Sequence, residues 1–347
     1  MPQTLVLVEK HLQIGGSWAG LTVFDAVRRA FPEVSPREVW RLARSGEIRR
    51  DGGRCHPQDR LDADNLLTVT LRRPARPAPS VPTREQEPVE TCAGPFWIVR
   101  EDADLLVVSK PAGCASHPAA RHRGDTLLDR VREYLGVRPE HPFQPALANR
   151  LDIDTSGLVL IAKARGAQNR LGRDLQKGKL RKGYLTLVGG WPEPPQGEVV
   201  VPLERRPDSR DLARHGADHP RCQGRVQAAH TRYRTRERLD RVLRAALLEV
   251  EILTGRTHQI RRHLTHLGHP LAGDRRYGDP GFNRAMREVA GLERMFLHAA
   301  QMDLQHPASS EPLRLEAPLP PELIAALAGL GCRIQGPGPL DAPAAPG

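Results

Sequence analysis

Residues 149–162 place charged side chains directly before an uninterrupted apolar segment. The charged residues are Arg150, Asp152 and Asp154, and a Thr-Ser-Gly sequence separates them from the apolar residues 158–162. An apolar run of this length that begins after a turn signal predicts a strand buried on both faces. The polar groups would then lie on a loop at the end of a core strand, where functional residues are often found. Taken alone, the pattern more often marks a turn in which the carboxylates accept hydrogen bonds from backbone N–H groups.

The length of the chain and the changes in composition along it predict two folded domains and two irregular segments. At 347 residues the chain is longer than one compact domain usually is. A small domain is expected over residues 1–73, followed by a proline-rich linker over 74–92. The large domain is expected over 93–325 and should begin with a hairpin or buried strand over 96–110. Residues 326–347, rich in Gly, Pro and Ala, are expected to form a disordered tail.

The small domain should contain two short helices, a strand hairpin and a further strand. Apolar residues recur at helical spacing from Val23, and Ser35 with Glu38 makes a capping box before a second such pattern. A strand then enters an Asp-Gly turn within residues 47–54, and 66–71 alternates as another strand. These patterns alone predict an ordinary small α/β module.

The charge of the chain favours a polyanionic partner. Lys and Arg total 52 against 41 Asp and Glu, which gives a formal net charge of +11. Only six of these cations are Lys, so the charge is mostly guanidinium, which binds phosphate through two hydrogen bonds. A compositional bias toward Arg explains that ratio equally well. The aromatic content of 4% argues against broad surfaces on which nucleic-acid bases stack.

Several other classes of protein are excluded by what the sequence lacks. No apolar run approaches bilayer length and no leader-like pattern opens the chain, so a cytoplasmic protein without membrane association is expected. The five cysteines form no Cys-x-x-Cys pair, which argues against a disulfide framework and a zinc ribbon. No phosphate-binding loop, dinucleotide fingerprint or zinc-helix motif is present, so we expect neither a cofactor nor a metal. Four histidines within 258–269 have no carboxylate or thiol among them, so they are expected to be structural or to contact the polyanionic partner and not to bind a metal.

The charged loop of residues 149–162 closely resembles the signature segment of the RluA family of pseudouridine synthases. That segment reads Arg-Leu-Asp, two variable residues, Ser or Thr, Ser-Gly and then a strand. Four further blocks resemble the family in the same order along the chain: 107–113 with His117-Pro118, 182–190, 253–278, and 297–299 with His306-Pro307. The resemblance covers residues from about 96 to 320. Asn149 and Thr186 depart from it, because family members commonly carry His and Ala there.

The resemblance implies an α+β fold, with a mixed, mostly antiparallel sheet and flanking helices, and an RNA pseudouridine synthase activity. Such an isomerase breaks the N-glycosidic bond of uridine and rejoins the base through C5, which needs a carboxylate near C1′ and C6. By resemblance Asp152 is this carboxylate, and it attacks the base or assists the departure of uracil at C1′. Arg261 would hold it ionised through a bidentate pair. Tyr184 would pack beside the base and help remove the C5 proton, with a purely structural strand position as the equal alternative.

A stacked uridine must be flipped out of the RNA before it reaches such a site. Arg150 is expected to enter the space that the flipped nucleotide leaves. The other residues expected by resemblance to contact the RNA or the substrate are Lys110, Lys182, Arg256, Thr257, His258 and Gln259.

Two segments concentrate the cationic residues that would contact the RNA backbone. Residues 163–182 contain eight cationic side chains, with Asp174 as the single acid. In isolation such a run is usually a solvated helix face, whereas beside a base-flipping site it would follow the phosphates. Residues 205–244 contain twelve arginines, and the first half of this segment is expected to be a mobile loop that becomes ordered on RNA.

Residues 21–71 resemble the S4-type RNA-binding domain, so the small domain over 1–73 is expected to be of this type. Its basic face would be formed by arginines of the second helix and the hairpin, namely Arg41, Arg44, Arg49, Arg50 and Arg54. Relatives with such a domain often act on large-subunit ribosomal RNA, so rRNA is the expected substrate, with tRNA second, and a monomer is expected. The alternative is a catalytically silent RNA-binding or ribosome-assembly protein, and the presence of Asp152, Tyr184 and Arg261 argues against it.

Overall fold

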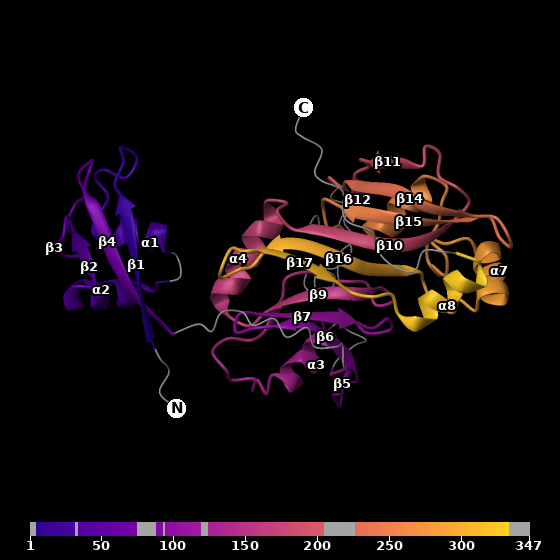
Figure 1. The fold of residues 1–347 in the computed structure, drawn as a ribbon, viewed down its shortest axis with the longest axis horizontal. Coiled ribbons are helices and arrows are strands. Elements are labelled where there is room, and N and C mark those ends of the chain that lie inside the picture. The colour runs from indigo at the N-terminus through magenta and orange to yellow at the C-terminus, as the bar shows by residue number, and fades with distance from the viewer. Residues whose placement is uncertain are drawn as a thin grey trace, which may run out of the picture. The chain divides into compact units, whose positions relative to one another are not determined.

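The computed structural model describes residues 5–31, 34–74, 88–92, 94–118, 124–204 and 226–332. The chain divides into two compact units, Met1–Val81 and Pro82–Gly347 (Figure 1). The division falls inside the segment predicted as a linker, most of which lies outside the described residues. The predicted basic loop lies largely outside them too, at 205–225.

The first unit is a four-stranded antiparallel sheet with two helices. The sheet order is β1 (Leu5–Gln13), β4 (Leu66–Pro74), β2 (Ile48–Arg50) and β3 (Gly53–Arg54). The helices are α1 (Val23–Ala30) and α2 (Pro36–Ser45), as the sequence predicts. Ser35 begins α2 by accepting a hydrogen bond from the amide of Glu38 at 3.2 Å, which is the expected cap. The sequence patterns did not predict β1, which pairs with β4 along its whole length.

The second unit is built on one large sheet, which confirms the predicted fold class. The eleven-stranded sheet has the order β11-β14-β15-β10-β16-β9-β7-β6-β5, with β17 paired to β16 and β8 to β9. Its pairs are antiparallel in the described part of the chain except for β16 and β9, which run parallel. The strands are β5 (Pro88–Val89), β6 (Phe96–Glu101), β7 (Leu105–Lys110), β8 (Ala146–Leu147), β9 (Ser156–Ala162), β10 (Arg181–Gly189), β11 (Gln196–Val199), β14 (Thr231–Leu239), β15 (Ala245–Ile252), β16 (Leu297–Gln305) and β17 (Pro312–Glu316), with a separate pair β12 (Leu203–Glu204) and β13 (Val226–Gln227).

Helices cover this sheet, so its central strands are buried on both faces. They are α3 (Leu127–Tyr134), α4 (Arg165–Gln176), α6 (Gln259–His266), α7 (Pro280–Ala290) and α8 (Pro321–Gly329). Figure 1 shows α4 toward one end of the sheet and α7 beside α8 toward the other. Along β10, Tyr184 and Val188 belong to one hydrophobic core, and Leu185 and Leu187 belong to the core on the opposite face. Every residue of β9 is buried, as its apolar sequence predicts.

Two predicted boundaries are wrong. β5 pairs with β6, so residues 88–92 belong to the large unit and not to the linker. The predicted tail includes the end of α8, where Leu327 and Leu330 are each 1% exposed. These apolar residues recur at helical spacing and pack into the core, which outweighs the Gly- and Ala-rich composition. Residues 333–347 of that tail lie outside the described residues. No helix in the described ranges has the length and apolar character needed to cross a membrane.

Candidate active site

A pocket of about 930 Å³ opens where the loop before β9 meets one end of β10 and the segment that leads into α6. Its lining includes nine of the ten predicted site residues, namely Arg150, Asp152, Lys182, Tyr184, Arg256, Thr257, His258, Gln259 and Arg261. The end of α4 contributes Lys177 and Gly178. Segments far apart in the sequence therefore converge on one cavity, and Lys110 is the predicted residue that does not line it.

The loop that carries Asp152 is fixed by hydrogen bonds from several elements. Ser116 Oγ accepts from the amide of Leu151 at 3.1 Å and donates to its carbonyl at 2.8 Å. Beyond Asp152, the Arg294 guanidinium donates to the carbonyl of Asp154 at 3.3 Å and to Ser156 Oγ at 2.9 Å. Because both sides of Asp152 are held, its carboxylate has a defined position at the pocket.

Gly157 follows this loop at a point where no other residue fits. Its φ is +112°, and a Cβ added there would lie 2.2 Å from the carbonyl oxygen of Ala299 on β16. The close approach is made by the parallel pairing of β9 and β16, in which Gly157 lies opposite Ala299. The Ser-Gly sequence therefore brings the Asp152 loop against β16 as the chain enters the core strand.

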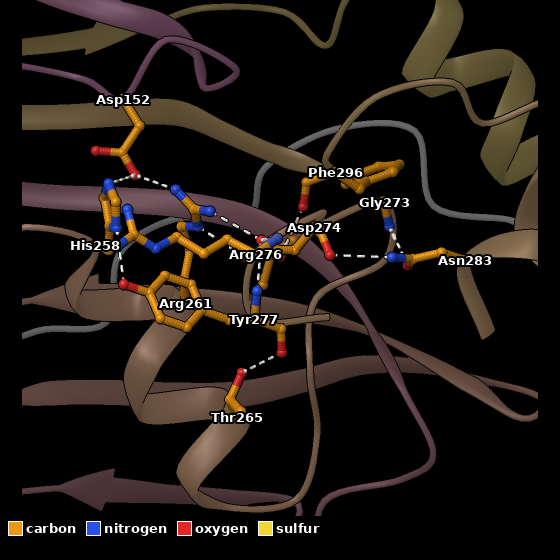
Figure 2. A network of polar contacts seen from close by, with 11 residues as sticks. Asp152, His258, Arg261, Thr265, Gly273, Asp274, Arg276, Tyr277, Asn283 and Phe296 are labelled. Atoms are coloured by element: carbon orange, nitrogen blue, oxygen red, sulfur yellow. Dashed lines mark hydrogen bonds and ion pairs between the residues drawn. The ribbon is translucent and has the colours of Figure 1, made fainter. Parts of the chain in front are cut away.

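Arg261 joins the Asp152 carboxylate to a second, fully buried carboxylate (Figure 2). The Arg261 Nη1 group donates to Asp152 Oδ2 at 3.1 Å. The Nε and Nη2 groups of Arg261 donate to the two oxygens of Asp274, at 2.7 and 2.8 Å. The predicted pairing of Arg261 with Asp152 is present, but the bidentate pair is made with Asp274. The geometric reason is that the buried Asp274 carboxylate meets the Nε and Nη2 groups side by side. Asp152, at the pocket, meets only Nη1.

Asp274 is itself held in place by its own loop. Its side chain is 1% exposed, and Oδ1 accepts from the amides of Arg276 at 2.9 Å and Tyr277 at 3.0 Å. The ring of Tyr277 lies 5.0 Å from the guanidinium carbon of Arg261, which places an aromatic face against the cation. Burial alone would lower the pKa of Arg261, but Asp274, with help from Asp152, outweighs burial and raises it further above its ordinary value. Arg261 is therefore a permanent cation beside Asp152.

His258 approaches Asp152 from the same segment. It adopts a left-handed backbone conformation, with φ of 55°, at the position that begins α6. Its Nδ1 atom lies 3.0 Å from the hydroxyl of Tyr277, and its Nε2 atom lies 3.9 Å from Asp152 Oδ2. That second distance is too long for a hydrogen bond, but it is within the range of an ion pair when the imidazole is protonated.

Comparison with known proteins identifies the family of this chain. Residues 104–266 match the family described as RNA pseudouridylate synthase. The chain is 34% identical over 317 residues to the ribosomal large subunit pseudouridine synthase C of Escherichia coli strain K12, across 89% of this chain and 93% of that protein. The chain belongs to the RNA pseudouridine synthase family. The resemblance to the RluA family is thereby confirmed, and the protein is an isomerase that converts uridine to pseudouridine in RNA.

Other relatives agree in sequence and in fold. The synthase C of Pasteurella multocida is 34% identical over 320 residues, across 90% of this chain and 91% of its own. The solved structure of human RNA pseudouridylate synthase domain containing 4 is similar with a TM-score of 0.53 and 26% identity, covering 69% of this chain and 94% of that one. The solved structure of human RNA pseudouridylate synthase domain containing 1 is also similar, with a TM-score of 0.50 and 27% identity. The match covers 67% of this chain and 87% of that one.

Tyr184 of this synthase lies on β10 with its side chain at the pocket, and it is 5% exposed. Burial, reinforced by the negative charge of Asp152, raises the pKa of the Tyr184 hydroxyl well above its ordinary value. The hydroxyl is therefore a neutral phenol at neutral pH. The position of the ring at the pocket wall fits the expected packing beside the base, and removal of the C5 proton by Tyr184 stays a prediction.

Two of the residues predicted to contact RNA have structural roles instead. Lys110 is 1% exposed, and its ammonium donates to the carbonyls of Pro111, Cys114 and Ile153 at 2.8, 2.8 and 3.2 Å. It therefore ties the Asp152 loop to the preceding turn. Gln259 is 3% exposed, and its amide donates to the carbonyl of His230 at 2.9 Å and accepts from the amide of Arg256 at 3.0 Å. Both side chains use their polar groups within the protein.

The other predicted contact residues can reach a ligand. Arg150 and Thr257 are exposed at the pocket, and Arg256 is half-buried, with its Nε group held by the carbonyl of Ala228 at 2.9 Å. Lys182 is only 5% exposed but also lines the pocket.

The histidines of this segment follow the structural expectation where hydrogen bonds define them. His263 is fully buried, with Nδ1 2.9 Å from Thr231 Oγ1 and Nε2 2.9 Å from the carbonyl of Val201. His269 Nδ1 lies 2.9 Å from the carbonyl of Gly189. Within the described ranges, no group of three or more His, Cys, Asp or Glu side chains could hold a metal ion.

Sequence reasoning missed two residues that position the site. Asp274 lies in one of the family-like blocks, but the block does not show which polar residue faces Arg261. Arg294 lies outside all of the blocks, and its contacts to Asp154 and Ser156 span 140 and 138 residues of sequence. A local pattern cannot report contacts at such separations.

Proposed function

We propose that this synthase modifies uridines of large-subunit ribosomal RNA and that Asp152 is its catalytic carboxylate. The position of Asp152 in the wall of the pocket is the observation that supports this role. Asp152 is the only acidic residue in the lining of the pocket among the described residues, and its side chain is 26% exposed. A carboxylate held by a permanent cation and open to a cavity can meet a substrate atom without a large rearrangement.

The reaction balances with the groups at hand. The bond between uracil N1 and ribose C1′ breaks, a bond between C5 and C1′ forms, C5 loses its proton and N1 gains one, so substrate and product are isomers. Asp152 attacks the base or assists departure of uracil at C1′, and any bond that it forms breaks again to release the carboxylate when C5 joins C1′. Arg261 keeps the carboxylate ionised before the reaction begins. Tyr184 packs beside the base while it turns.

The pocket requires the uridine to leave its stack. Asp152 lies on a loop at the cavity and Tyr184 on its wall, so a base held within a helix cannot reach them. Arg150, exposed at the same loop, is placed to enter the vacated space. The proposal of ribosomal RNA rests on the relatives, because those with 34% identity are named as ribosomal large subunit pseudouridine synthases.

We extend the proposal to residues 1–73 of the first unit, as an S4-like RNA-binding domain. Among the described residues, Arg44 and Arg49 have only backbone carbonyls as hydrogen-bond partners, that of Trp40 for Arg44 and those of Gly46 and Gly52 for Arg49. Their positive charge is not neutralised by those carbonyls and is available for phosphates. Replacing both by Gln in the full chain should weaken binding of ribosomal RNA and leave turnover at saturating RNA unchanged.

The experiment uses total RNA from a strain that lacks the gene. Wild type, Asp152→Asn and the neighbouring control Asp154→Asn are incubated with this RNA, and pseudouridines are mapped by carbodiimide labelling and primer extension. We expect modification of large-subunit rRNA by wild type and by the control, and none by Asp152→Asn. Modification of tRNA alone would overturn the proposed substrate, and equal modification by Asp152→Asn would overturn the proposed role of Asp152.

A further inference from the structure

Lys182 is a buried lysine whose ammonium has no partner among the residues that the structure describes. It lies on β10 two positions before Tyr184, lines the same pocket and is 5% exposed. Across the described ranges, no side-chain or backbone oxygen accepts a hydrogen bond from Lys182 and no carboxylate pairs with it. The other buried lysine, Lys110, shows what stability alone would favour, because its ammonium donates to three carbonyls.

Such a placement destabilises the folded protein. An ammonium loses its hydration on burial, and here no protein group replaces the lost water contacts. Burial accordingly lowers the pKa of Lys182 to about 8, which still leaves it mostly protonated at neutral pH. Natural proteins usually pair a buried charge with a counter-group, and the exceptions are expected at functional sites. The ammonium of Lys182 at the wall of this pocket is such an exception.

The surroundings of Lys182 point to an anionic ligand. Gly255 lies directly beside the ammonium, because a Cβ added to this glycine would lie 3.7 Å from Nζ, an ordinary contact distance, and Gly255 lines the same pocket. Arg256 and Lys177 line the same cavity. The lining contains one acid, Asp152, and Arg261 already pairs with it. This side of the pocket therefore has positive charge in excess of its protein counter-ions.

In RNA the phosphodiester is the group that carries a formal negative charge at neutral pH, whereas uracil and ribose are neutral. We infer that Lys182 binds a phosphodiester flanking the flipped uridine and serves as its counter-ion inside the pocket. This inference rests on the proposed RNA substrate. The contact forms only when the nucleotide has left its stack and drawn its backbone into the cavity, so it offsets part of the cost of flipping.

The role predicts opposite effects on stability and on binding. Lys182→Met removes the unpaired charge and keeps an unbranched apolar side chain, so the thermal unfolding temperature should rise. The same variant should raise KM for RNA about tenfold, since a charge-assisted hydrogen bond is lost, and should change KM more than kcat. The dependence of affinity on salt should fall by about one phosphate contact. Lys182→Arg should retain most of the affinity.

The decisive experiment pairs the variants with modified RNA. A short RNA substrate of the wild-type enzyme is synthesised with a neutral methylphosphonate at one or the other phosphate flanking the target uridine. For wild type, one of the two substitutions should weaken binding about tenfold, and for Lys182→Met the same substitution should change binding less than twofold. The control Arg314→Gln removes an exposed cation of β17 that does not line the pocket, and it should respond as wild type does.

The outcomes are separate from those of the proposed function. If wild type modifies no RNA, the proposed substrate fails. If wild type is active but Lys182→Met remains as sensitive to methylphosphonate as wild type, the assignment of Lys182 is overturned. A loss of kcat with unchanged KM would mean that the ammonium acts on the base, which also overturns it. A lower unfolding temperature in both Lys182→Met and Lys182→Gln would show a structural role and overturn it as well.

Discussion

The buried carboxylate of Asp274 gives the sharpest prediction about how the site is positioned. Replacing Asp274 by Asn keeps the size of the side chain and an oxygen for the amides of Arg276 and Tyr277. It removes the charge and turns an N–H₂ group toward Arg261, where two oxygens now accept at 2.7 and 2.8 Å. The Arg261 cation would then keep its contact to Asp152 and a hydrogen bond from Nη2 to a neutral amide oxygen, and it would lose the charged acceptor of its Nε group.

The decrease in the free energy of unfolding of Asp274→Asn follows from the contacts that are lost. Hydrogen bonds to charged groups contribute about 1.5–3 kcal/mol each, and breaking a buried ion pair from one side costs about 3–5 kcal/mol. Arg261 retains Asp152 at 3.1 Å, so the lower end applies and the free energy of unfolding should fall by about 3 kcal/mol. For a unit of this size that corresponds to a decrease of about 6–12 °C in unfolding temperature. Because the Asp274 carboxylate would no longer fix the Arg261 guanidinium beside Asp152, kcat should fall by about 10- to 100-fold.

Calorimetry of the full chain measures the first effect, and turnover of an RNA substrate well below both unfolding temperatures measures the second. The control is Glu249→Gln, which weakens a half-buried carboxylate bound by Arg234 and Arg236 outside the pocket. It should lower the unfolding temperature without changing kcat. An Asp274→Asn enzyme that loses stability but keeps its kcat would refute the positioning argument, and an unchanged unfolding temperature would refute the energetic one.

Three further predictions concern the Asp152 loop and the strand beside it. Gly157→Ala should unfold the large unit or abolish expression of folded protein, because its Cβ would lie 2.2 Å from a backbone oxygen of Ala299; circular dichroism checks this. Ser116→Ala frees both backbone groups of Leu151, so kcat should fall about tenfold while the unfolding temperature falls only slightly; kinetics beside calorimetry separate the two. Burial lowers the pKa of His298 to about 4, so the unfolded state binds the extra proton as pH falls below about 6.5, and the folded state binds it only near 4. Stability should therefore fall by roughly 2–3 kcal/mol between pH 7 and 4.5 from this residue, and a His298→Gln variant that shows the same pH dependence would contradict the assignment.

The sequence predicted the parts of this molecule that depend on local patterns. The two helices of the first unit begin where Thr22 and Ser35 cap them, and β9 is buried throughout because its residues are apolar without alternation. The Asp152 loop, Tyr184 and Arg261 were also placed at one site, through the order of the family-like blocks. The end of α8 was missed because a Gly- and Ala-rich composition conceals the spacing of Leu327 and Leu330.

What the sequence could not show is which charged group each polar residue faces. Lys110 and Lys182 both lie in family-like blocks, and both were predicted to contact the substrate. In the fold, three carbonyls surround the Lys110 ammonium, whereas Lys182 faces a cavity beside Gly255. The two lysines differ in their surroundings because Lys110 contacts a carbonyl 43 residues away in the sequence, whereas Lys182 lies at the wall of the pocket. No local sequence pattern reports either environment. A buried ammonium is tolerated only when a counter-group exists in the protein or arrives with the substrate. The ammonium of Lys110 therefore stabilises the fold, whereas that of Lys182, by our inference, is available for an anion of the substrate.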